Sequence, residues 1–251
     1  MPVLITRPDE PGRILTEQLN LMGIPAHHFP LISITAPPTN SGLESALLAA
    51  NIIIAVSQYA VSFTQQIVKS WPNTCQYFAI GSKTAQTLKQ VTQNKVYTPR
   101  IHDSEHLLQL EQLNESQIKN LKIVILRGNG GRDLIYEQLT RRGAHVEYRE
   151  VYQRKNIQFD SKSTITKWQD KLIQHIVITS SEQLNHLLSM CEEHKSWLLK
   201  CCLYVPSQRI ASQAQAFGFN QIVCTEGASN AVITRALQAH IKENNNDQKE
   251  Q

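Results

Sequence analysis

Hydroxyl, amide and basic side chains follow most of the short apolar runs of this sequence, each time just before a stretch with helical spacing. Such a place joins side-chain donors to the free N–H groups of a helix N-terminus, a combination that binds carboxylates or phosphates. Ser and Thr are also ordinary helix N-caps, so each residue alone has a purely structural alternative. The candidate ligand-binding residues are Thr6, Arg7, Ser57, Gly81, Ser82, Lys83, Thr84, Arg127, Gly128, Thr179, Ser180, Ser181 and Ser207.

Two arginines occupy equivalent places in this pattern. Arg7 and Arg127 each end a strand-like apolar run. A guanidinium there either anchors a ligand carboxylate through paired hydrogen bonds or forms an ion pair with an acid of its own domain. The sequence favours neither alternative.

Tyr152 is the one polar aromatic residue whose position suggests chemistry. It lies in Glu150-Val151-Tyr152-Gln153, where the chain is expected to cross between domains. A phenol with a pKa near 10 is protonated at neutral pH and can act as a general acid. The structural alternative is an edge-strand tyrosine with a hydrated hydroxyl. No Ser-His-Asp set or nucleophile elbow competes with it.

Two local patterns resemble cofactor sites, but each lacks residues that such a site requires. The run Gly128-Asn129-Gly130-Gly131-Arg132 lacks the last glycine of a dinucleotide fingerprint, because Asp133 stands there, and it lacks the lysine of a P-loop. His102 and His106 are four apart, but Glu105 is misplaced for a zinc-protease motif and no distant third ligand is evident. We therefore predict no metal and no organic cofactor.

Composition excludes several classes of protein. The chain has 251 residues, 41% of them hydrophobic, and a formal net charge of +4. Its best apolar run, residues 46–56, is broken by Asn51 and is shorter than the roughly 18 residues of a membrane span. No signal peptide and no basic stripe are seen. We expect a cytoplasmic monomer with reduced cysteines that binds neither membranes nor nucleic acid.

An internal repeat organises the chain. The segment from Val3 matches the segment from Ile123 without a gap, at a shift of 120 positions, and Gly23 falls on Gly143 at the end of each predicted helix. A second pair of segments matches at a shift of about 124 to 126, from Ile52 and from Ile176. Apolar runs that alternate with amphipathic stretches predict βα units and parallel sheets. The repeat leaves open which copies pack together.

Several short motifs, taken in order, resemble the uroporphyrinogen-III synthase family. The resemblance extends to about Leu237. Its motifs are Leu4-Ile5-Thr6-Arg7-Pro8, Pro30-Leu31-Ile32, Ala79-Ile80-Gly81-Ser82-Lys83-Thr84-Ala85, Ile125-Leu126-Arg127-Gly128, Arg142-Gly143-Ala144, Val151-Tyr152, Ile178-Thr179-Ser180-Ser181 and Val205-Pro206-Ser207.

This resemblance implies a crossed, two-domain α/β fold. Two doubly wound parallel-sheet domains, related by the duplication, would be joined by a two-stranded crossover linker, with the active site in the cleft between them. Domain one would contain residues 1–33 and 156–241, and domain two residues 38–149. The linker strands would be residues 34–37 and 150–155. The polar residues 242–251 are expected to be disordered.

The family closes the linear tetrapyrrole hydroxymethylbilane into uroporphyrinogen III, inverting ring D and losing water without a cofactor. The resemblance places its catalytic tyrosine at Tyr152 and the threonine of its Gly-x-x-Thr-Ala motif at Thr84. Ser57, Ser180 and Ser181 match positions facing the cleft. The second copy of the motif has no threonine, which leaves Ser207 or backbone N–H groups to bind substrate.

A second hypothesis comes from the absence of a charged catalytic constellation. The same residues suit a non-enzymatic two-domain protein that closes on a small anion, since a fold alone does not fix a function. Such a protein would bind its ligand saturably and would show no turnover.

Overall fold

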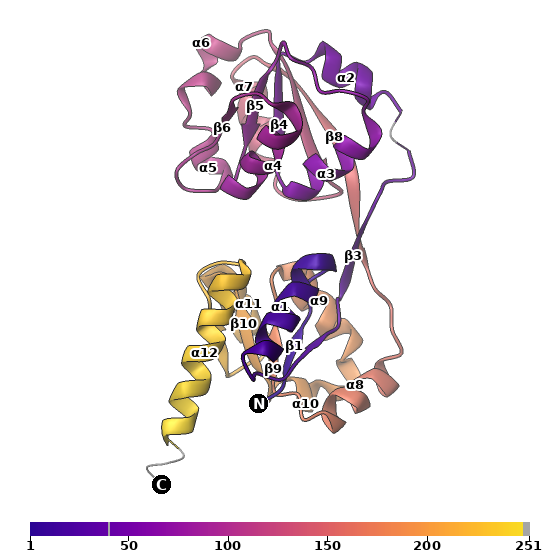
Figure 1. Ribbon diagram of the computed structural model, residues 1–251, viewed down its shortest axis with the longest axis vertical. Coiled ribbons are helices and arrows are strands. Elements are labelled where there is room, and N and C mark those ends of the chain that lie inside the picture. Colours follow the sequence, from indigo (N-terminus) through magenta and orange to yellow (C-terminus); the bar gives the residue numbers. More distant parts are fainter. Residues whose placement is uncertain (40, 248–251) are drawn as a thin grey trace. The chain divides into compact units, whose positions relative to one another are not determined.

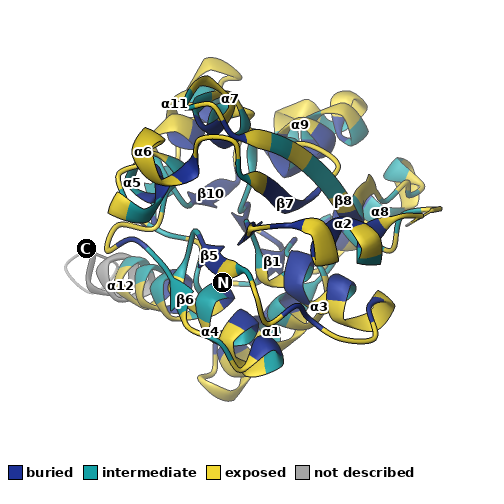
Figure 2. Cartoon of the chain, turned by 90° about the horizontal axis from the view of Figure 1, so that it is seen from above, coloured by how far each residue is buried: buried dark blue, intermediate teal, exposed yellow. Residues whose placement is uncertain are grey.

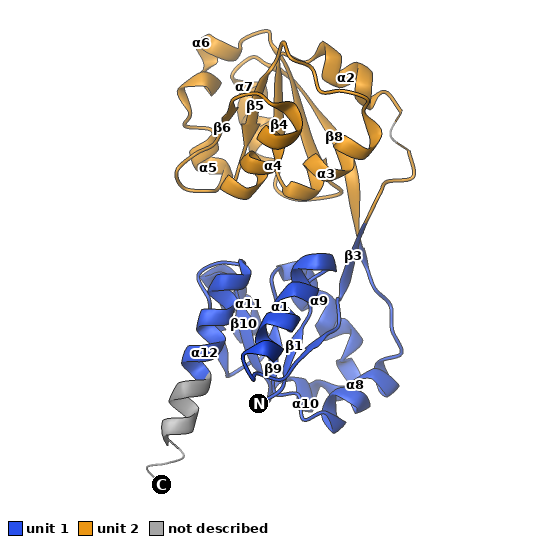
Figure 3. Ribbon diagram, in the orientation of Figure 1, with its two compact units in different colours: residues 1–34, 155–251 blue, residues 35–154 orange. Residues whose placement is uncertain are grey.

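The computed structural model describes residues 1–39 and 41–247, and these form two compact units. Unit 1 contains Met1–Ile34 and Lys155–Gln251, and unit 2 contains Thr35–Arg154 (Figures 1 and 3). Each unit is an α/β layer structure built on one sheet, so the predicted fold class is confirmed. None of the helices in the described ranges has the length and apolarity to cross a membrane.

The sheet of unit 1 has five parallel strands in the order β11-β10-β9-β1-β2. Its strands are β1 (Val3–Ile5), β2 (Ala26–His28), β9 (His175–Val177), β10 (Cys202–Val205) and β11 (Ile222–Cys224). Every residue of β1, β9 and β10 is buried, because helices cover both faces of the sheet (Figure 2).

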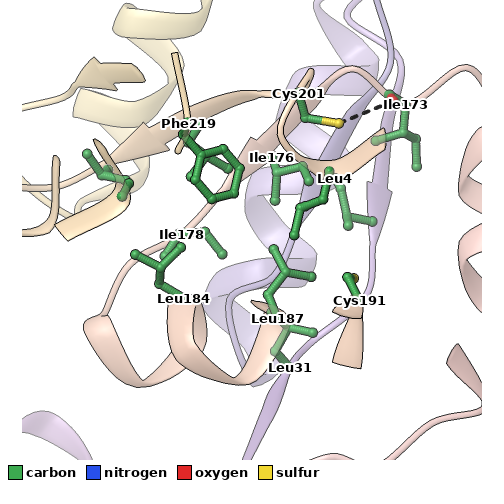
Figure 4. Packing of buried hydrophobic residues seen from close by; sticks show 14 of the residues in the cluster. Leu4, Leu31, Ile173, Ile176, Ile178, Leu184, Leu187, Cys191, Cys201 and Phe219 are labelled. Atoms are coloured by element: carbon green, nitrogen blue, oxygen red, sulfur yellow. Dashed lines mark hydrogen bonds between the residues drawn. The ribbon is translucent and has the colours of Figure 1, made fainter. Parts of the chain in front are cut away.

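Alternation along these strands divides the core of unit 1 into two clusters. Leu4 and Ile176 point into one cluster, beneath α8 (Ser161–Asp170), α9 (Ser181–Met190) and α11 (Gln208–Ala216) (Figure 4). Val3 and Val177 point into the other, against α1 (Asp9–Leu21) and α12 (Asn230–Asp247). The short helix α10 (Lys195–Leu198) follows the 3-10 turn Glu192–His194.

The sheet of unit 2 has six strands in the order β3-β8-β7-β4-β5-β6. They are β3 (Ile32–Thr35), β4 (Ile52–Ala55), β5 (Gln76–Ala79), β6 (Val96–Tyr97), β7 (Lys122–Gly128) and β8 (His145–Asn156). Its helices are α2 (Leu43–Ala49), α3 (Gln58–Ile67), α4 (Ser82–Thr92), α5 (Ser104–Leu107), α6 (Glu115–Ile118) and α7 (Leu134–Arg141), with a 3-10 turn at Glu111–Leu113.

The duplication is visible in the strand orders. Reading β2-β1-β9-β10-β11 beside β8-β7-β4-β5-β6 gives the same arrangement twice. Each sheet therefore joins one copy of the first repeat to the distant copy of the second. Gly23 and Gly143, at φ +76° and +81°, end the corresponding helices α1 and α7 in the left-handed conformation that glycine adopts readily.

The end of the chain corrects one expectation. Disorder is predicted from residue 242, but α12 continues to Asp247; residues 248–251 lie outside the described part. Buried Ile233 and Leu237 anchor the helix, and no Gly or Pro follows them. Extending a formed helix adds a hydrogen bond for each residue fixed, so a polar composition alone does not stop it.

Gly12 in α1 provides a test of the packing in unit 1. An added Cβ would lie 2.3 Å from the Arg7 carbonyl oxygen and 2.4 Å from His28 Nε2. Overpacking costs about 1–3 kcal/mol, and alanine regains about 1 kcal/mol of helix propensity. We expect Gly12→Ala to lower the free energy of unfolding by about 1 kcal/mol in urea titrations. Gly81→Ala is the control, since its nearest neighbour would be 3.9 Å away. Equal midpoints for both variants would contradict the packing argument.

Candidate active site

Tyr152 is positioned by an irregularity in strand β8. Arg127 pairs with Glu150, but the next residue, Gly128, pairs with Tyr152, so Val151 is an extra residue in the ladder. Such a bulge re-aims the side chains that follow it. A Cβ on Gly128 would lie 2.4 Å from Tyr152 Cε2. The glycine therefore provides the space that the tyrosine ring occupies.

The Tyr152 hydroxyl is held by two donors from unit 2. Ser57 Oγ donates to it at 3.1 Å, and the Arg154 guanidinium donates at 3.3 Å. Ser57 is also the N-cap of α3, where its Oγ accepts from the Ala60 N–H at 3.1 Å. Because both contacts use the phenol oxygen as acceptor, its own proton is available for donation to another group.

The surroundings of this tyrosine are apolar. Its ring lies 5.7 Å from the ring of Tyr59 and 6.1 Å from the ring of Phe63, centroid to centroid. The residue is only 1% exposed, so the alternative of a hydrated edge-strand tyrosine is wrong. Arg154 is exposed, and its side chain is the partner that can move to admit a ligand.

Arg127 has partners inside its own unit. It is buried, and Nη1 forms an ion pair with Asp133 at 2.9 Å, while Nε donates to the Gly128 carbonyl at 3.2 Å. Its guanidinium carbon lies 4.2 Å from the centroid of the Tyr148 ring, and the Tyr148 hydroxyl donates to the same carboxylate at 3.0 Å. Of the two alternatives for this arginine, the structure contains the internal ion pair.

These contacts also set the pKa values of the group. The hydrogen bond from Arg127 and then that from Tyr148 lower the pKa of Asp133 below its ordinary value. Burial, followed by the hydrogen bond to Asp133, raises the pKa of Tyr148 to about 12. At neutral pH the carboxylate is ionised and the phenol is protonated, which keeps the network intact.

In unit 1, two predicted ligand-binding hydroxyls bond internally. Thr6 is fully buried and its Oγ1 donates to the Val177 carbonyl at 2.6 Å, which links β1 to β9. Thr179 donates to Gln183 Oε1 through its N–H at 2.8 Å and its Oγ1 at 3.0 Å. Gln183 Nε2 in turn donates to the Thr6 carbonyl at 3.2 Å. Both threonines thus hold the ends of their strands together.

Gln183 is a site-shaping residue that the sequence reasoning missed. A signal for it exists, because Ser180 is the N-cap of α9 and Gln183 stands three residues later, as in a capping box. Ser180 Oγ accepts from the Gln183 N–H at 3.2 Å, but the glutamine side chain reaches Thr179 instead of the N-cap itself. The reach to β1 depends on strand pairing across the chain, which the motif does not contain.

The other predicted residues of unit 1 lie at the same edge of its sheet. The Arg7 guanidinium donates to Asn230 Oδ1 at the start of α12. The backbone carbonyl oxygen of Arg7 contacts His28 Nε2 at 2.8 Å. Ser181 Oγ accepts from Arg209 at 2.9 Å. Ser207 is the N-cap of α11.

The helices after the strands differ in how their N-termini are capped. Ser57 and Ser180, at equivalent places in the two units, cap their helices through Oγ. At the other equivalent pair, Gly81 before α4 and Ser207 before α11, the described residues supply no side-chain cap. The first N–H groups of α4 and α11 are thus the better placed of the four to bind an anionic ligand.

The predicted Gly81-Ser82-Lys83-Thr84 segment begins α4. Ser82 and Lys83 are exposed, whereas Thr84 is buried in the first turn. An exposed amine beside uncapped N–H groups suits a carboxylate ligand.

Comparisons with known proteins agree with this architecture. The family model for uroporphyrinogen-III synthase HemD matches residues 14–234. Uroporphyrinogen-III synthase of Escherichia coli is 39% identical over 248 residues, which cover 95% of this chain and all of that protein. The chain belongs to the uroporphyrinogen-III synthase family. The resemblance seen in the short motifs is confirmed.

A further relative supports the assignment, and two solved structures share the fold. Uroporphyrinogen-III synthase of Salmonella typhimurium is 38% identical, again over 95% of this chain and the whole of its own. A mutant synthase from Thermus thermophilus has a TM-score of 0.63 at 14% identity and covers 95% of this chain and 99% of its own. The Helicobacter pylori synthetase has a TM-score of 0.62, with coverage of 95% and 98%. At this identity the structures establish the fold alone.

Gly128→Ala tests the contact that positions the tyrosine. The new methyl group would overlap the Tyr152 ring, and we expect a loss of about 1–3 kcal/mol in the free energy of unfolding. In a Tyr152→Ala background the ring is absent, so the same change should cost less by about 1 kcal/mol or more. Urea unfolding of the two single variants and the double variant measures this coupling. Additive costs would show that the two residues do not constrain one another.

Proposed function

We propose that this chain closes hydroxymethylbilane into uroporphyrinogen III, inverting ring D and releasing water. Family membership over nearly the whole chain carries the proposal. Enzymes of this family are cyclising lyases of tetrapyrrole synthesis, which sets aside the hypothesis of a non-enzymatic binding protein. Incubation with freshly generated hydroxymethylbilane, followed by separation of the ring isomers, tests it. Formation of the uninverted isomer alone, as without enzyme, would contradict it.

Recognition of the substrate rests on its carboxylates. Each of its four rings carries an acetate and a propionate, so the ligand is a polyanion. We infer that the N–H groups at the starts of α4 and α11 bind some of these groups, with Lys83, Ser207 and Arg7 as side-chain donors. The net charge of +4 favours the approach of such a ligand.

Tyr152 is the proposed general acid. The C–O bond of the hydroxymethyl group breaks with its electrons on oxygen, the phenol proton completes a water molecule, and an azafulvene cation remains. Ring D then attacks through its substituted carbon to form a spiro intermediate. The bond from that carbon to the bridge from ring C breaks and the bridge bonds to the free carbon of ring D, which inverts the ring and leaves a proton on that carbon to be lost. The Ser57 hydroxyl and the Arg154 guanidinium already donate to the phenol oxygen, so they stabilise the phenolate until a proton returns as the final ring regains aromaticity.

Most of the remaining catalysis is positional. Closure without enzyme attacks the unsubstituted carbon of ring D, so the protein must hold the flexible chain in the geometry that favours the strained attack. No step requires a redox or Lewis-acid group, so the reaction as proposed proceeds without a cofactor.

We further propose residues 1–33 with 156–241 and residues 38–149 as the two domains, with linkers at 34–37 and 150–155. The division of the chain into compact units after Ile34 and after Arg154 supports these boundaries. The linker 150–155 lies wholly within β8, and the first two residues of the linker 34–37 are the end of β3. We propose that the protein acts as a cytoplasmic monomer.

Replacing Tyr152 by Phe tests the general acid directly. The ring and its packing against Gly128 remain, so stability should change by only about 1 kcal/mol. Turnover should fall by roughly 10²-fold or more, the size expected for loss of general acid catalysis. Tyr77→Phe is the matched control, because it removes another buried hydroxyl of unit 2, one that donates to the Pro72 carbonyl at 2.6 Å. If Tyr152→Phe forms the correct isomer at a near-normal rate, the proton donor is a carboxyl group of the substrate and not Tyr152.

The two arginines should respond differently to removal. Arg7→Ala should raise KM and weaken its dependence on salt, because an anchoring charge is lost. Arg127→Ala should mainly lower stability, since it removes a buried side chain that contacts the Tyr148 ring and pairs with the exposed Asp133. The exposed Arg13, paired with Glu10 and Glu17, provides an Arg→Ala control. Steady-state kinetics at low and high salt, together with urea unfolding, separate the effect on binding from the effect on stability. An unchanged KM in Arg7→Ala would show that Arg7 does not bind the substrate.

A further inference from the structure

A cluster of nitrogen and sulfur donors lies at the amino-terminal edge of the unit 1 sheet, opposite the carboxyl ends of its strands. It consists of His175, Cys202 and His240, whose donor atoms are all within 4.8 Å of one another. His175 and Cys202 are the first residues of β9 and β10 and are paired in the ladder between those strands. His240 comes from α12. The cluster therefore joins a helix to the amino-terminal edge of the sheet, whereas the proposed substrate contacts in this unit follow the carboxyl ends.

The cluster is largely buried and packs against an aromatic ring. His175 is 4% exposed and Cys202 is 1% exposed, while His240 is half-buried. The rings of His175, His240 and Tyr204 pack against one another with centroids 5.8 to 5.9 Å apart. Cys202 and Tyr204 belong to the core cluster that contains Val3 and Ile5, so packing from several elements fixes their positions.

The His175 imidazole is in the form that binds metal ions, whereas the Cys202 thiol must lose a proton on binding, because burial raises its pKa to about 11. Burial, and then the neighbouring His240, lower the pKa of His175 to about 4, so its imidazole is neutral at pH 7. Neutral imidazole is the form that binds metal ions. His175 Nδ1 contacts the Tyr204 hydroxyl at 3.3 Å, and Nε2 lies 3.2 Å from Met1 Sδ. A hydroxyl and a thioether thus border the three donors.

We propose that His175, Cys202 and His240 bind a closed-shell transition-metal ion, Zn(II) or Cu(I), as a structural site independent of ring closure. Two imidazoles and one thiolate are the donors that these ions prefer. Binding converts the Cys202 thiol to a thiolate and releases one proton to solvent. A fourth position is completed by water, the Tyr204 hydroxyl or the Met1 thioether.

The geometry requires a modest contraction. Metal–nitrogen bonds of about 2.0–2.1 Å and metal–sulfur bonds of about 2.3 Å place tetrahedral donors about 3.3–3.6 Å apart. The present donors are within 4.8 Å of one another, and His240, the half-buried one of the three, has the most room to move. The bound ion would fasten α12 to the first residues of β9 and β10.

Cobalt(II) is the probe for the donor set. The full-length protein, treated with a chelator and then freed of it, is titrated with Co(II). A thiolate ligand gives a sulfur-to-cobalt charge-transfer band, and intense visible bands mark a four-coordinate site. We expect one equivalent of Co(II) to produce both, and Zn(II) to displace it. A competition titration with Cu(I) then compares the affinities of the site for Zn(II) and Cu(I).

Two cysteine variants provide a matched comparison. Cys201 immediately precedes Cys202, but it packs into the opposite core cluster, where Sγ approaches the Ile173 carbonyl at 3.9 Å (Figure 4). Cys202→Ala should abolish the charge-transfer band, and Cys201→Ala should retain it. His240→Ala changes only a half-buried helix side chain, so it covers the case in which Cys202→Ala does not fold; it should weaken metal binding by about 100-fold or more, since even outer-shell groups contribute about 10–100-fold.

The readouts also separate this site from the proposed catalysis. Zn(II) should raise the Tm of the parent protein and of Cys201→Ala by several degrees, and should not raise that of His240→Ala. Turnover of hydroxymethylbilane should be similar with and without the metal. Absence of stoichiometric binding, or binding that survives both Cys202→Ala and His240→Ala, overturns the proposal. Neither result bears on whether Tyr152 is the general acid.

Discussion

Each sheet is held together at its centre by two parallel strands that are far apart in the sequence. In unit 1, β1 pairs with β9, so that Leu4 lies beside Ile176; in unit 2, β4 pairs with β7, so that Ile53 lies beside Val124. All four of these residues are buried, since helices cover both faces of each sheet. Neither copy of a repeat can bury its strands alone, and the polar ends of the strands converge only because these central pairs form.

The site in unit 2 follows from this pairing and from one departure from regularity. Gly128 ends a central strand, and the bulge at Val151 turns Tyr152 toward it. The same strand end holds Arg127, which draws in Asp133 and Tyr148 and so fixes the glycine-rich turn that follows. The proposed proton donor, the hydroxyl that contacts it and a neighbouring cation are thereby placed by backbone geometry more than by charge.

Sequence reasoning located most of the elements because their signals are local. Apolar runs, helix spacing and the glycines at 23 and 143 depend on near neighbours, and the repeat reveals itself by comparison within the chain. What it missed depends on distant contacts. The reach of Gln183 to Thr6 and the bulge at Val151 require strands that are brought together only in the fold. The continuation of α12 to Asp247 depends on helix propagation, which a polar composition does not reveal.

The placement of β1 also has a consequence for synthesis on the ribosome. Unit 2 is contiguous, Thr35–Arg154, and is complete in the nascent chain before its neighbour. The segment β1-α1-β2 emerges first, but its central partner β9 begins only at His175, more than a hundred residues later. At about 5–20 residues per second the first strand waits roughly 9 to 34 seconds for that partner. During this interval the edge of an apolar strand is unpaired and can associate with other chains. Factors that bind nascent polypeptides are therefore needed most at residues 1–30.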